Sequence, residues 1–409
     1  MKLPELLAPA GNYEKMLAAF RYGADAVYLA GEDFGMRSAA KNFSLDEISK
    51  AVEYAHSISK KVYLTVNTMP HEFQYPALKE FFRSLASFPP DGLIISDMGV
   101  FALAGEILPD VDRHVSTQAS TMSSASCNFW YKLGAKRIVL AREVSLDEII
   151  EIRRNIPAQL ELEAFVHGSM CISHSGRCLL SNYLTGRDAN RGACTQPCRW
   201  NFVISEEKRE NIKLPVFEDD GTFIMASKDM CMIEHIPELV ECGISSLKIE
   251  GRMKSSYYAA VTSNTYRMAL DAYKNDPAGY KFDPLWNYEL DSVSHREYAT
   301  GYYFTSPAEE ANVVTEGGYI REKAYLAEAT GLVDENGYAE FLQRNKVSTG
   351  DNVELLVPGE VGKPFLIDRM LDSEGVEILS APHPMQKFRI KVPFEVKEGY
   401  IIRGGGSNT

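Results

Sequence analysis

The chain has 409 residues, of which 45% are hydrophobic and 24% charged, as is ordinary for a globular protein with a packed core. Its length indicates more than one domain, because single cores stop growing at roughly 250–300 residues. The formal net charge of −13 argues against a general nucleic-acid binder and restricts any nucleic-acid contact to a local basic patch. We find neither a signal-peptide pattern nor an apolar run of the ~20 residues that span a bilayer. We therefore expect a cytoplasmic protein with no membrane contact.

Short β-branched runs alternate with helix-patterned segments through residues 1–275. This alternation predicts βαβ units and a parallel sheet, and eight strands over roughly 250 residues indicate a TIM-type (β/α)8 barrel. A doubly wound open sheet is the rival, but the turn Ala10-Gly11-Asn12-Tyr13 lacks its glycine-rich fingerprint. The predicted strands are 5–10, 26–30, 62–67, 92–97, 113–118, 137–142, 160–167 and 246–250, and the predicted helices include 12–22, 45–57, 75–86, 99–108 and 146–155.

Several predicted strands carry polar residues at every second position, which places those side chains on one face. Parallel strands covered on both sides are usually almost entirely apolar, so a polar face suits a barrel with a solvated or ligand-filled mouth. The alternative is that these are satisfied interior polar groups. The sets are Tyr63, Thr65 and Asn67; His114, Ser116 and Gln118; Glu161, Glu163, Phe165 and His167; and Ser246, Lys248 and Glu250.

Two irregular regions divide the rest of the chain. Residues 168–227 replace the simple loop and helix expected after the seventh strand, and residues 276–321, rich in Pro, Tyr and Asp, form a connector. Short strand-like runs separated by turn signals then predict a small all-β, barrel-like domain over residues 322–403. Residues 404–409 are predicted to be a disordered tail.

Four cysteines follow the seventh predicted strand with the spacing C-x6-C-x15-C-x3-C. Four thiolates in one loop satisfy the ligand count of a 4Fe-4S cluster or of a zinc ion. Structural zinc usually pairs cysteines two to four residues apart, as only the last pair is here, so the spacing favours the cluster over zinc or over unligated core thiols. The predicted ligands are Cys171, Cys178, Cys194 and Cys198, and Cys231 is an alternative fourth ligand.

Active sites of such barrels lie at the C-terminal ends of the strands. His167 is four residues before Cys171 and is expected beside the metal centre, with Glu163 placed to orient it, unless it is a satisfied structural histidine. The candidate catalytic residues are His167, Glu163, Gln118 and Glu250. The candidate substrate-binding residues are Asn67, Arg142, Arg177, Lys248, Arg252 and Lys254. For the charged cluster at 248–254, the alternative is a paired ion network. The arginines of the cysteine loop are either a solvated basic surface or a patch that holds phosphates or carboxylates; they are Arg177, Arg187, Arg191 and Arg199.

The motif Glu163-x-Phe165-x-x-Gly168-Ser169-Met170-Cys171, followed by Gly176-x-Cys178-x-Leu180-Ser181, resembles the signature of the collagenase-like peptidase family U-32. Segments 5–11, 116–118 and 246–252 also look like that family. Within it, segments 175–182, 187–194 and 196–200 are most similar to the tRNA hydroxylation subgroup.

This resemblance implies an iron–sulfur enzyme that helps to make 5-hydroxyuridine at the tRNA wobble position, with prephenate as a small carboxylate co-substrate. Relatives differ in the fourth cluster ligand, which keeps both Cys198 and Cys231 as candidates. Older naming of the family implies a protease, but the chain has no His-Glu-x-x-His or Gly-x-Ser-x-Gly segment. An oxygen-independent hydroxylase of another substrate, or a non-enzymatic protein with the cluster as a structural staple, would also fit these motifs.

Overall fold

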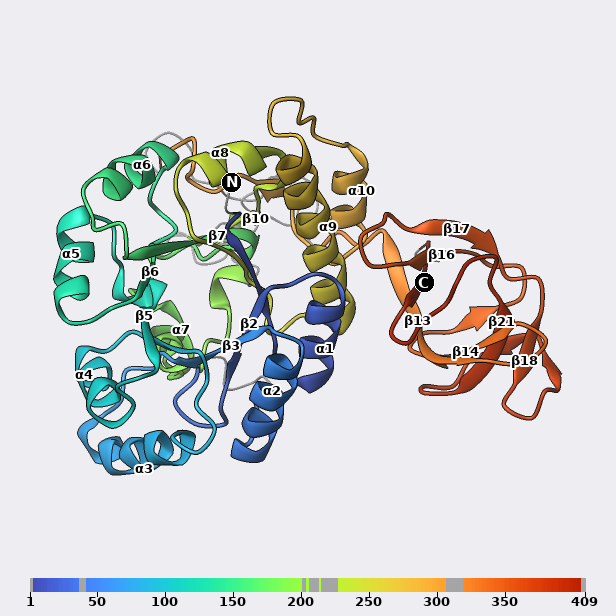
Figure 1. Ribbon diagram of the computed structural model, residues 1–409, viewed down its shortest axis with the longest axis horizontal. Coiled ribbons are helices and arrows are strands. Elements are labelled where there is room, and N and C mark those ends of the chain that lie inside the picture. Colours follow the sequence, from blue (N-terminus) through green and yellow to red (C-terminus); the bar gives the residue numbers. More distant parts are fainter. Residues whose placement is uncertain are drawn as a thin grey trace. The chain divides into compact units, whose positions relative to one another are not determined.

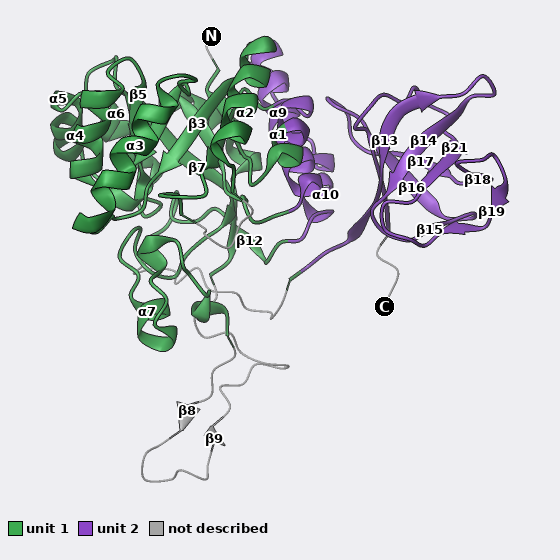
Figure 2. Cartoon of the chain, turned by 90° about the horizontal axis from the view of Figure 1, so that it is seen from below, with its two compact units in different colours: residues 1–16, 24–254, 295–319 green, residues 17–23, 255–294, 320–409 purple. Residues whose placement is uncertain are grey.

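The computed structural model describes residues 3–36, 42–200, 204–205, 213–214, 227–306 and 319–405. The chain divides into two compact units (Figure 2): unit 1 holds residues 1–16, 24–254 and 295–319, and unit 2 holds residues 17–23, 255–294 and 320–409. Parts of the predicted cysteine insertion, of the connector and of the tail lie outside the described residues. Among the described residues, no helix is long and apolar enough to cross a membrane.

Unit 1 is built around a closed barrel of parallel strands (Figure 1). The strands pair in chain order from β1 to β7, and β11 closes the ring by pairing with both β7 and β1. The predicted TIM-type barrel is therefore confirmed. Its strands are β1 (Glu5–Pro9), β2 (Ala26–Ala30), β3 (Lys61–Val66), β4 (Gly92–Ile95), β5 (Asp112–Val115), β6 (Arg137–Val139), β7 (Glu161–Ser169) and β11 (Ser246–Ile249).

The helices between the barrel strands begin at caps that the sequence supplies. Ser44 and Ser145 each form a capping box with the glutamate three residues later. The Asp97 carboxylate accepts the Val100 N–H at 2.9 Å and so caps α4. The helices of this unit are α2 (Leu45–Ser57), α3 (Tyr75–Leu85), α4 (Met98–Ile107), α5 (Ser124–Lys132), α6 (Leu146–Arg154), α7 (Leu180–Thr185) and α8 (Ile236–Glu241); α1 (Tyr13–Arg21) is shared between the two units.

The C-terminal end of β7 has an irregular register that matters for the site. Phe165 faces Lys248 of β11, but His167 faces Ile249, so the intervening residue of β7 is extra. Such a bulge interrupts the strict alternation of side chains along a strand. Beyond the bulge, β10 (Asp229–Cys231) pairs antiparallel with β7, and β12 (Tyr298–Ala299) pairs with β10.

Unit 2 combines two helices with an antiparallel β-domain, which confirms the predicted all-β domain. The predicted tail is wrong at Gly404 and Gly405, because both residues belong to a strand that pairs with β13, and Gly404 also pairs with β16. The main sheet has the order β17-β16-β22-β13-β14-β21-β18-β19. The elements are α9 (Ser256–Asn275), α10 (Leu285–Asp291), β13 (Lys323–Val333), β14 (Tyr338–Gln343), β16 (Asn352–Leu356), β17 (Lys363–Leu366), β18 (Met370–Asp372), β19 (Glu377–Ile378), β21 (Lys387–Lys391) and β22 (Ile401–Gly405), with β15 (Val347–Ser348) and β20 (Ser380–Ala381) as a separate pair.

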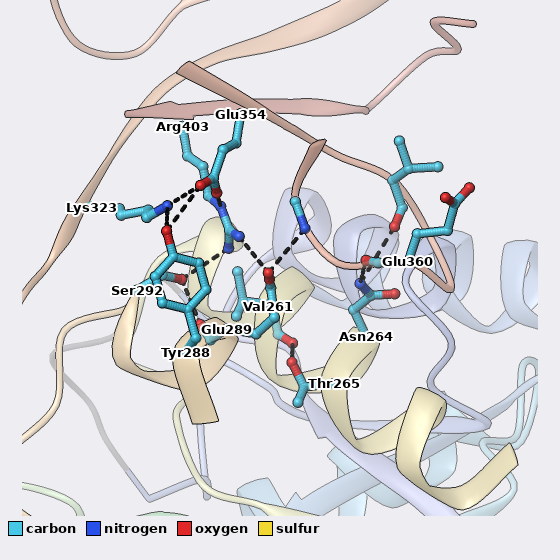
Figure 3. Close-up of polar contacts among 12 residues, drawn as sticks. Val261, Asn264, Thr265, Tyr288, Glu289, Ser292, Lys323, Glu354, Glu360 and Arg403 are labelled. Carbon is cyan, nitrogen blue, oxygen red and sulfur yellow. Dashed lines mark hydrogen bonds and ion pairs between the residues drawn. The ribbon is translucent and has the colours of Figure 1, made fainter. Parts of the chain in front are cut away.

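A buried polar network joins the helices of unit 2 to its sheet (Figure 3). Arg403 of β22 is fully buried and donates to Glu289 of α10 at 2.6 Å and to Glu354 of β16 at 2.8 Å. Lys323 of β13 also contacts Glu354. Because the partners come from a helix and from three strands, the network fixes α10 against the β-domain.

Candidate functional site

A cavity of about 160 Å³ lies at the C-terminal end of the barrel strands. All four predicted metal ligands line it, although they come from a segment with little regular structure. Cys231, the alternative ligand, does not line this cavity and lies on β10, where its Cα partner is His167. The structure therefore brings together Cys171, Cys178, Cys194 and Cys198.

The turn between the first two cysteines is clamped to the rim of the barrel. The Glu143 carboxylate accepts the Ser175 N–H at 2.8 Å and the Ser175 hydroxyl at 2.9 Å. Ser120 donates to the carbonyl of Ser175. At Gly176, which has a φ of +71°, a Cβ atom would lie 2.2 Å from the carbonyl oxygen of Gln118, so only glycine fits. These contacts position Cys171 and Cys178 over the strand ends.

The thiols share one environment without converging on a point. Cys171 is exposed and the other three are partly buried. Burial raises the pKa of the Cys198 thiol, and the nearby Cys171, Cys194 and Cys178 raise it further. In the described part of the chain, no three His, Cys, Asp or Glu side chains are arranged to hold a metal ion. By its chemistry a set of four cysteine thiols fits a 4Fe-4S cluster, which places each thiolate on a separate iron atom, and it also matches the ligand types of a zinc ion.

Three of the predicted anion-binding side chains bring positive charge to the cavity. They are Arg142, Lys248 and Arg252. Arg142 donates to the carbonyl of Ser169 at 2.9 Å, and its guanidinium carbon lies 4.0 Å from the centre of the Phe165 ring. Arg252 is 4% exposed. Its backbone lies so close to Gly11 that a Cβ there would be 2.1 Å from the Arg252 carbonyl oxygen, which explains a glycine in this turn.

The remaining predicted residues at the cavity are Asn67, Gln118 and Glu250. The Glu250 carboxylate accepts the hydroxyl of Tyr28 at 3.0 Å. The Asn67 side-chain oxygen accepts the Met36 N–H at 3.1 Å. The cavity thus combines thiols, cations, amides and one carboxylate.

Glu163 lies beneath the cavity in a buried ion network. Its carboxylate is fully buried and contacts Lys248 at 2.7 Å and Arg137 at 3.0 Å. Burial alone would raise the pKa of Glu163, but the charges and hydrogen bonds of Lys248 and Arg137 lower it below its ordinary value. Arg137 also pairs with Glu5 and Glu161. Glu163 therefore holds Lys248, which lines the cavity, and it is not itself a lining residue.

His167, Lys254 and Arg177 do not line the cavity. His167 is 1% exposed, with its ring centre 5.4 Å from that of Tyr298, and burial lowers its pKa to about 3, so that the ring is neutral. The β7 bulge places His167 opposite Ile249, so His167 does not line the cavity as Phe165 does. Lys254 lies 4.7 Å from the ring centre of Tyr319, and burial lowers its pKa. Arg177 is exposed on the cysteine segment.

Sequence reasoning missed two features of the cavity. Tyr28 lies over Lys248, whose nitrogen is 4.5 Å from the ring centre, and it is the only polar residue of its strand. A single tyrosine within an otherwise apolar strand is the pattern from which this position at the cavity could have been predicted. The clamp between Glu143 and Ser175 had no such signal, because it joins residues 32 positions apart.

Comparison with known proteins gives matches along most of the chain. The model of Peptidase family U32 matches residues 11–313, and that of the Peptidase family U32 C-terminal domain matches residues 321–403. The tRNA hydroxylation protein P1 of Bacillus subtilis is 38% identical over 99% of this chain and 95% of its own. The tRNA hydroxylation protein P of Escherichia coli is 34% identical, covering 98% and 96%.

A relative with a different name also matches. The protein named Collagenase from Porphyromonas gingivalis is 29% identical over 87% of this chain and 86% of its own. The relatives thus carry both kinds of name that the sequence motifs led us to expect, while their matches span the barrel and the β-domain alike. The chain belongs to peptidase family U32.

Proposed function

We propose that this chain is an iron–sulfur enzyme that hydroxylates uridine in tRNA, with a small carboxylate as co-substrate. The observation that carries the proposal is that four thiols and three cationic side chains share one cavity at the C-terminal end of the barrel. Enzymes with this fold act at that end. The names of two relatives supply tRNA hydroxylation as the reaction.

Cys171, Cys178, Cys194 and Cys198 would hold a 4Fe-4S cluster, because cysteine thiolates are the usual ligands of such clusters. When bound, the cluster would supply electron transfer to the reaction. The clamp of Glu143 on Ser175 fixes the turn that carries the first two thiols. These four cysteines would hold the group in the cavity that the cationic side chains also line.

The cationic side chains are suited to an organic anion. Guanidinium groups bind carboxylates through paired hydrogen bonds, so Arg142 and Arg252 can each take one carboxylate of a dicarboxylate such as prephenate. Lys248, held by Glu163 at 2.7 Å, adds a third positive charge. Glu250, beside the Tyr28 hydroxyl, is placed to accept a proton from a bound substrate.

The alternative of a peptidase rests on the name of the family and on the names of relatives. A cysteine peptidase needs a thiol and a base in contact. Cys171 lines the cavity, whereas the buried His167 does not. His174 does line it, and its Nδ1 lies 4.0 Å from the Glu143 carboxylate. The arrangement of the cavity therefore favours the cluster over a thiol nucleophile.

The cluster is tested by anaerobic purification with iron and sulfide analysis and electron paramagnetic resonance. We expect Cys171→Ser, Cys178→Ser, Cys194→Ser and Cys198→Ser each to lose most of the iron. Cys127→Ser, at a buried thiol on α5, is the matched control, and Cys231→Ser tests the alternative ligand. Full iron content in Cys198→Ser together with loss in Cys231→Ser would move the fourth ligand to β10.

The reaction is tested in cells, where we expect the enzyme to act on cytoplasmic tRNA. Deletion of the gene should remove 5-hydroxyuridine and its derivatives from tRNA digests analysed by mass spectrometry. Complementation with the wild type should restore them, whereas Arg252→Met should not. Unchanged modification in a deletion strain that has no second copy would overturn the proposal.

A further inference from the structure

The cysteine segment, residues 171–200, carries positive charge that the rest of the described structure does not neutralise. It contains four arginines and one acidic residue, Asp188, in a protein of net charge −13. The Asp188 side chain accepts the Asn190 N–H at 2.8 Å. Within the described residues, no carboxylate lies at ion-pair distance from these arginines, which are Arg177, Arg187, Arg191 and Arg199.

Helix α7, in the middle of this segment, presents large apolar side chains to solvent. Figure 1 shows α7 within the ring of helices, and Figure 2 shows it projecting beyond one end of the barrel. Leu180 lines the cavity, whereas Leu179 and Tyr183 are 71% and 86% exposed. The last two are four residues apart, and the Tyr183 N–H donates to the Leu179 carbonyl at 2.9 Å, so their side chains share one face.

This exposure belongs to an element that is held in place. The Ser181 hydroxyl donates to the carbonyl of Arg187 at 2.7 Å and accepts the Thr195 N–H at 3.1 Å. The Asn190 amide donates to the carbonyl of Cys178 at 2.8 Å. A fixed element that exposes neighbouring large apolar side chains is typical of a binding surface.

A second exposed aromatic lies beside the same segment. Arg191 donates to the side-chain oxygen of Gln74 at 3.2 Å, which ties the segment to the turn η1 (Glu72–Gln74). In that turn Phe73 is 76% exposed and stacks on His71, with ring centres 5.8 Å apart and an interplanar angle of 14°. The cysteine segment and η1 together form a surface, here called the rim, that exposes the aromatic side chains of Tyr183 and Phe73. The four arginines of the cysteine segment belong to the same surface.

We infer that this rim binds an unpaired RNA loop, with bases stacked on Tyr183 and Phe73 and phosphates held by Arg177 and Arg187. Single-stranded RNA is recognised by aromatic side chains that stack on unpaired bases and by cations that follow the backbone. The inference rests on the proposed function and adds to it the surface of the protein, outside the cavity, that binds the RNA, and the contacts that its residues make. An acidic peptide would also match the positive charge, but carboxylate side chains do not stack on exposed aromatic rings as nucleic-acid bases do.

The test is fluorescence anisotropy with anaerobically purified full-length chain. The probes are an unmodified tRNA, a hairpin RNA with an unpaired loop, and a fully paired RNA duplex with the same number of nucleotides as the hairpin. Because Tyr183→Ala removes one base stack, the variant should bind the hairpin roughly 5- to 160-fold more weakly than the wild type, with little effect on duplex binding. Tyr183→Phe should bind as the wild type does. Tyr131→Ala, at a 37% exposed tyrosine of α5, is the matched control.

Charge is tested in the same assay by titration with salt. Arg187→Ala should lower the slope of log affinity against log salt by roughly 0.7, the value for one phosphate contact on a single strand, and Arg187→Lys should keep the slope. Arg154→Ala, at an exposed arginine of α6, should change nothing. If the wild type binds the hairpin but Tyr183→Ala and Arg187→Ala bind equally well, the rim does not bind RNA and the inference fails while the proposed function stands. If the wild type binds neither the hairpin nor tRNA, the proposed function fails as well.

Discussion

Each unit of this chain buries an arginine among carboxylates, and the two networks serve different ends. In unit 1, Arg137 pairs with Glu5, Glu161 and Glu163, and Glu163 in turn holds Lys248 at the wall of the cavity. In unit 2, Arg403 pairs with Glu289 and Glu354 and joins a helix to a sheet. A buried charged side chain therefore shows only that it needs a partner of opposite charge. It indicates a role in binding or catalysis only where a member of its network also lines an open cavity, as Lys248 does.

The largest effect is expected from breaking the network of unit 2. Arg403→Met leaves the buried Glu289 carboxylate without its cation, whereas Glu354 keeps Lys323, and breaking a buried pair costs about 3–5 kcal/mol. We therefore expect unit 2 to lose about that much stability. Urea unfolding can be followed by the fluorescence of Trp286, which is buried in α10, in a chain whose other tryptophans are replaced by phenylalanine.

The control for this loss is Arg369→Met, which breaks an ion pair whose side chains are 56% and 57% exposed. An exposed pair contributes at most about 1 kcal/mol. If Arg369→Met and Arg403→Met lowered the free energy of unfolding equally, burial would not matter for the Arg403 network, and its structural role in unit 2 would be refuted.

A somewhat smaller effect is expected from Glu163→Gln in unit 1. The substitution removes the carboxylate that faces Lys248 and Arg137, but Arg137 keeps Glu5 and Glu161, so we expect a loss near the lower limit for buried pairs, about 3 kcal/mol. Because the pKa of Glu163 is lowered in the folded chain, its contribution is present above the ordinary carboxyl range and is lost as pH falls through the folded pKa. Urea unfolding at a series of acidic pH values should show that the free energy of unfolding of Glu163→Gln falls less steeply with decreasing pH than that of the wild type. Equal slopes for the two proteins would contradict this.

The sequence predicted the barrel well because its signal is periodic. All eight predicted strands exist, with ends within three residues of those observed. The four thiols were found together because they lie in one short segment. His167 was expected beside the metal centre, but one extra residue at the β7 bulge shifts the alternation on which that placement relied. Burial of Arg137 and Arg403 could not be predicted, because each depends on partners from distant parts of the chain.

A local effect on the cavity is expected from Glu143→Ala. The substitution removes the acceptor of the Ser175 N–H and hydroxyl, and hydrogen bonds to a charged group contribute about 1.5–3 kcal/mol. The turn between Cys171 and Cys178 should therefore be less well anchored, and the anaerobically purified variant should contain less iron. Glu106→Ala, at an exposed glutamate of α4, is the control, and full iron content in Glu143→Ala would show that the clamp does not position the thiols.

The smallest effect concerns the acid stability of unit 1. Burial, aided by the charges of Arg137 and Lys248, lowers the pKa of His114 well below 6.5. The folded chain then keeps this ring neutral while the unfolded chain protonates it, so stability falls as pH drops below about 6.5, by at most about 1.4 kcal/mol per pH unit. His114→Phe keeps a ring against Tyr63, whose ring centre is 4.7 Å away, and should remove this part of the pH dependence. His383→Gln, at an exposed histidine, should leave the slope unchanged. An unaltered slope in His114→Phe would place the acid sensitivity of the barrel on other groups, of which Glu163 is the first to test because it shares with His114 the cations Arg137 and Lys248.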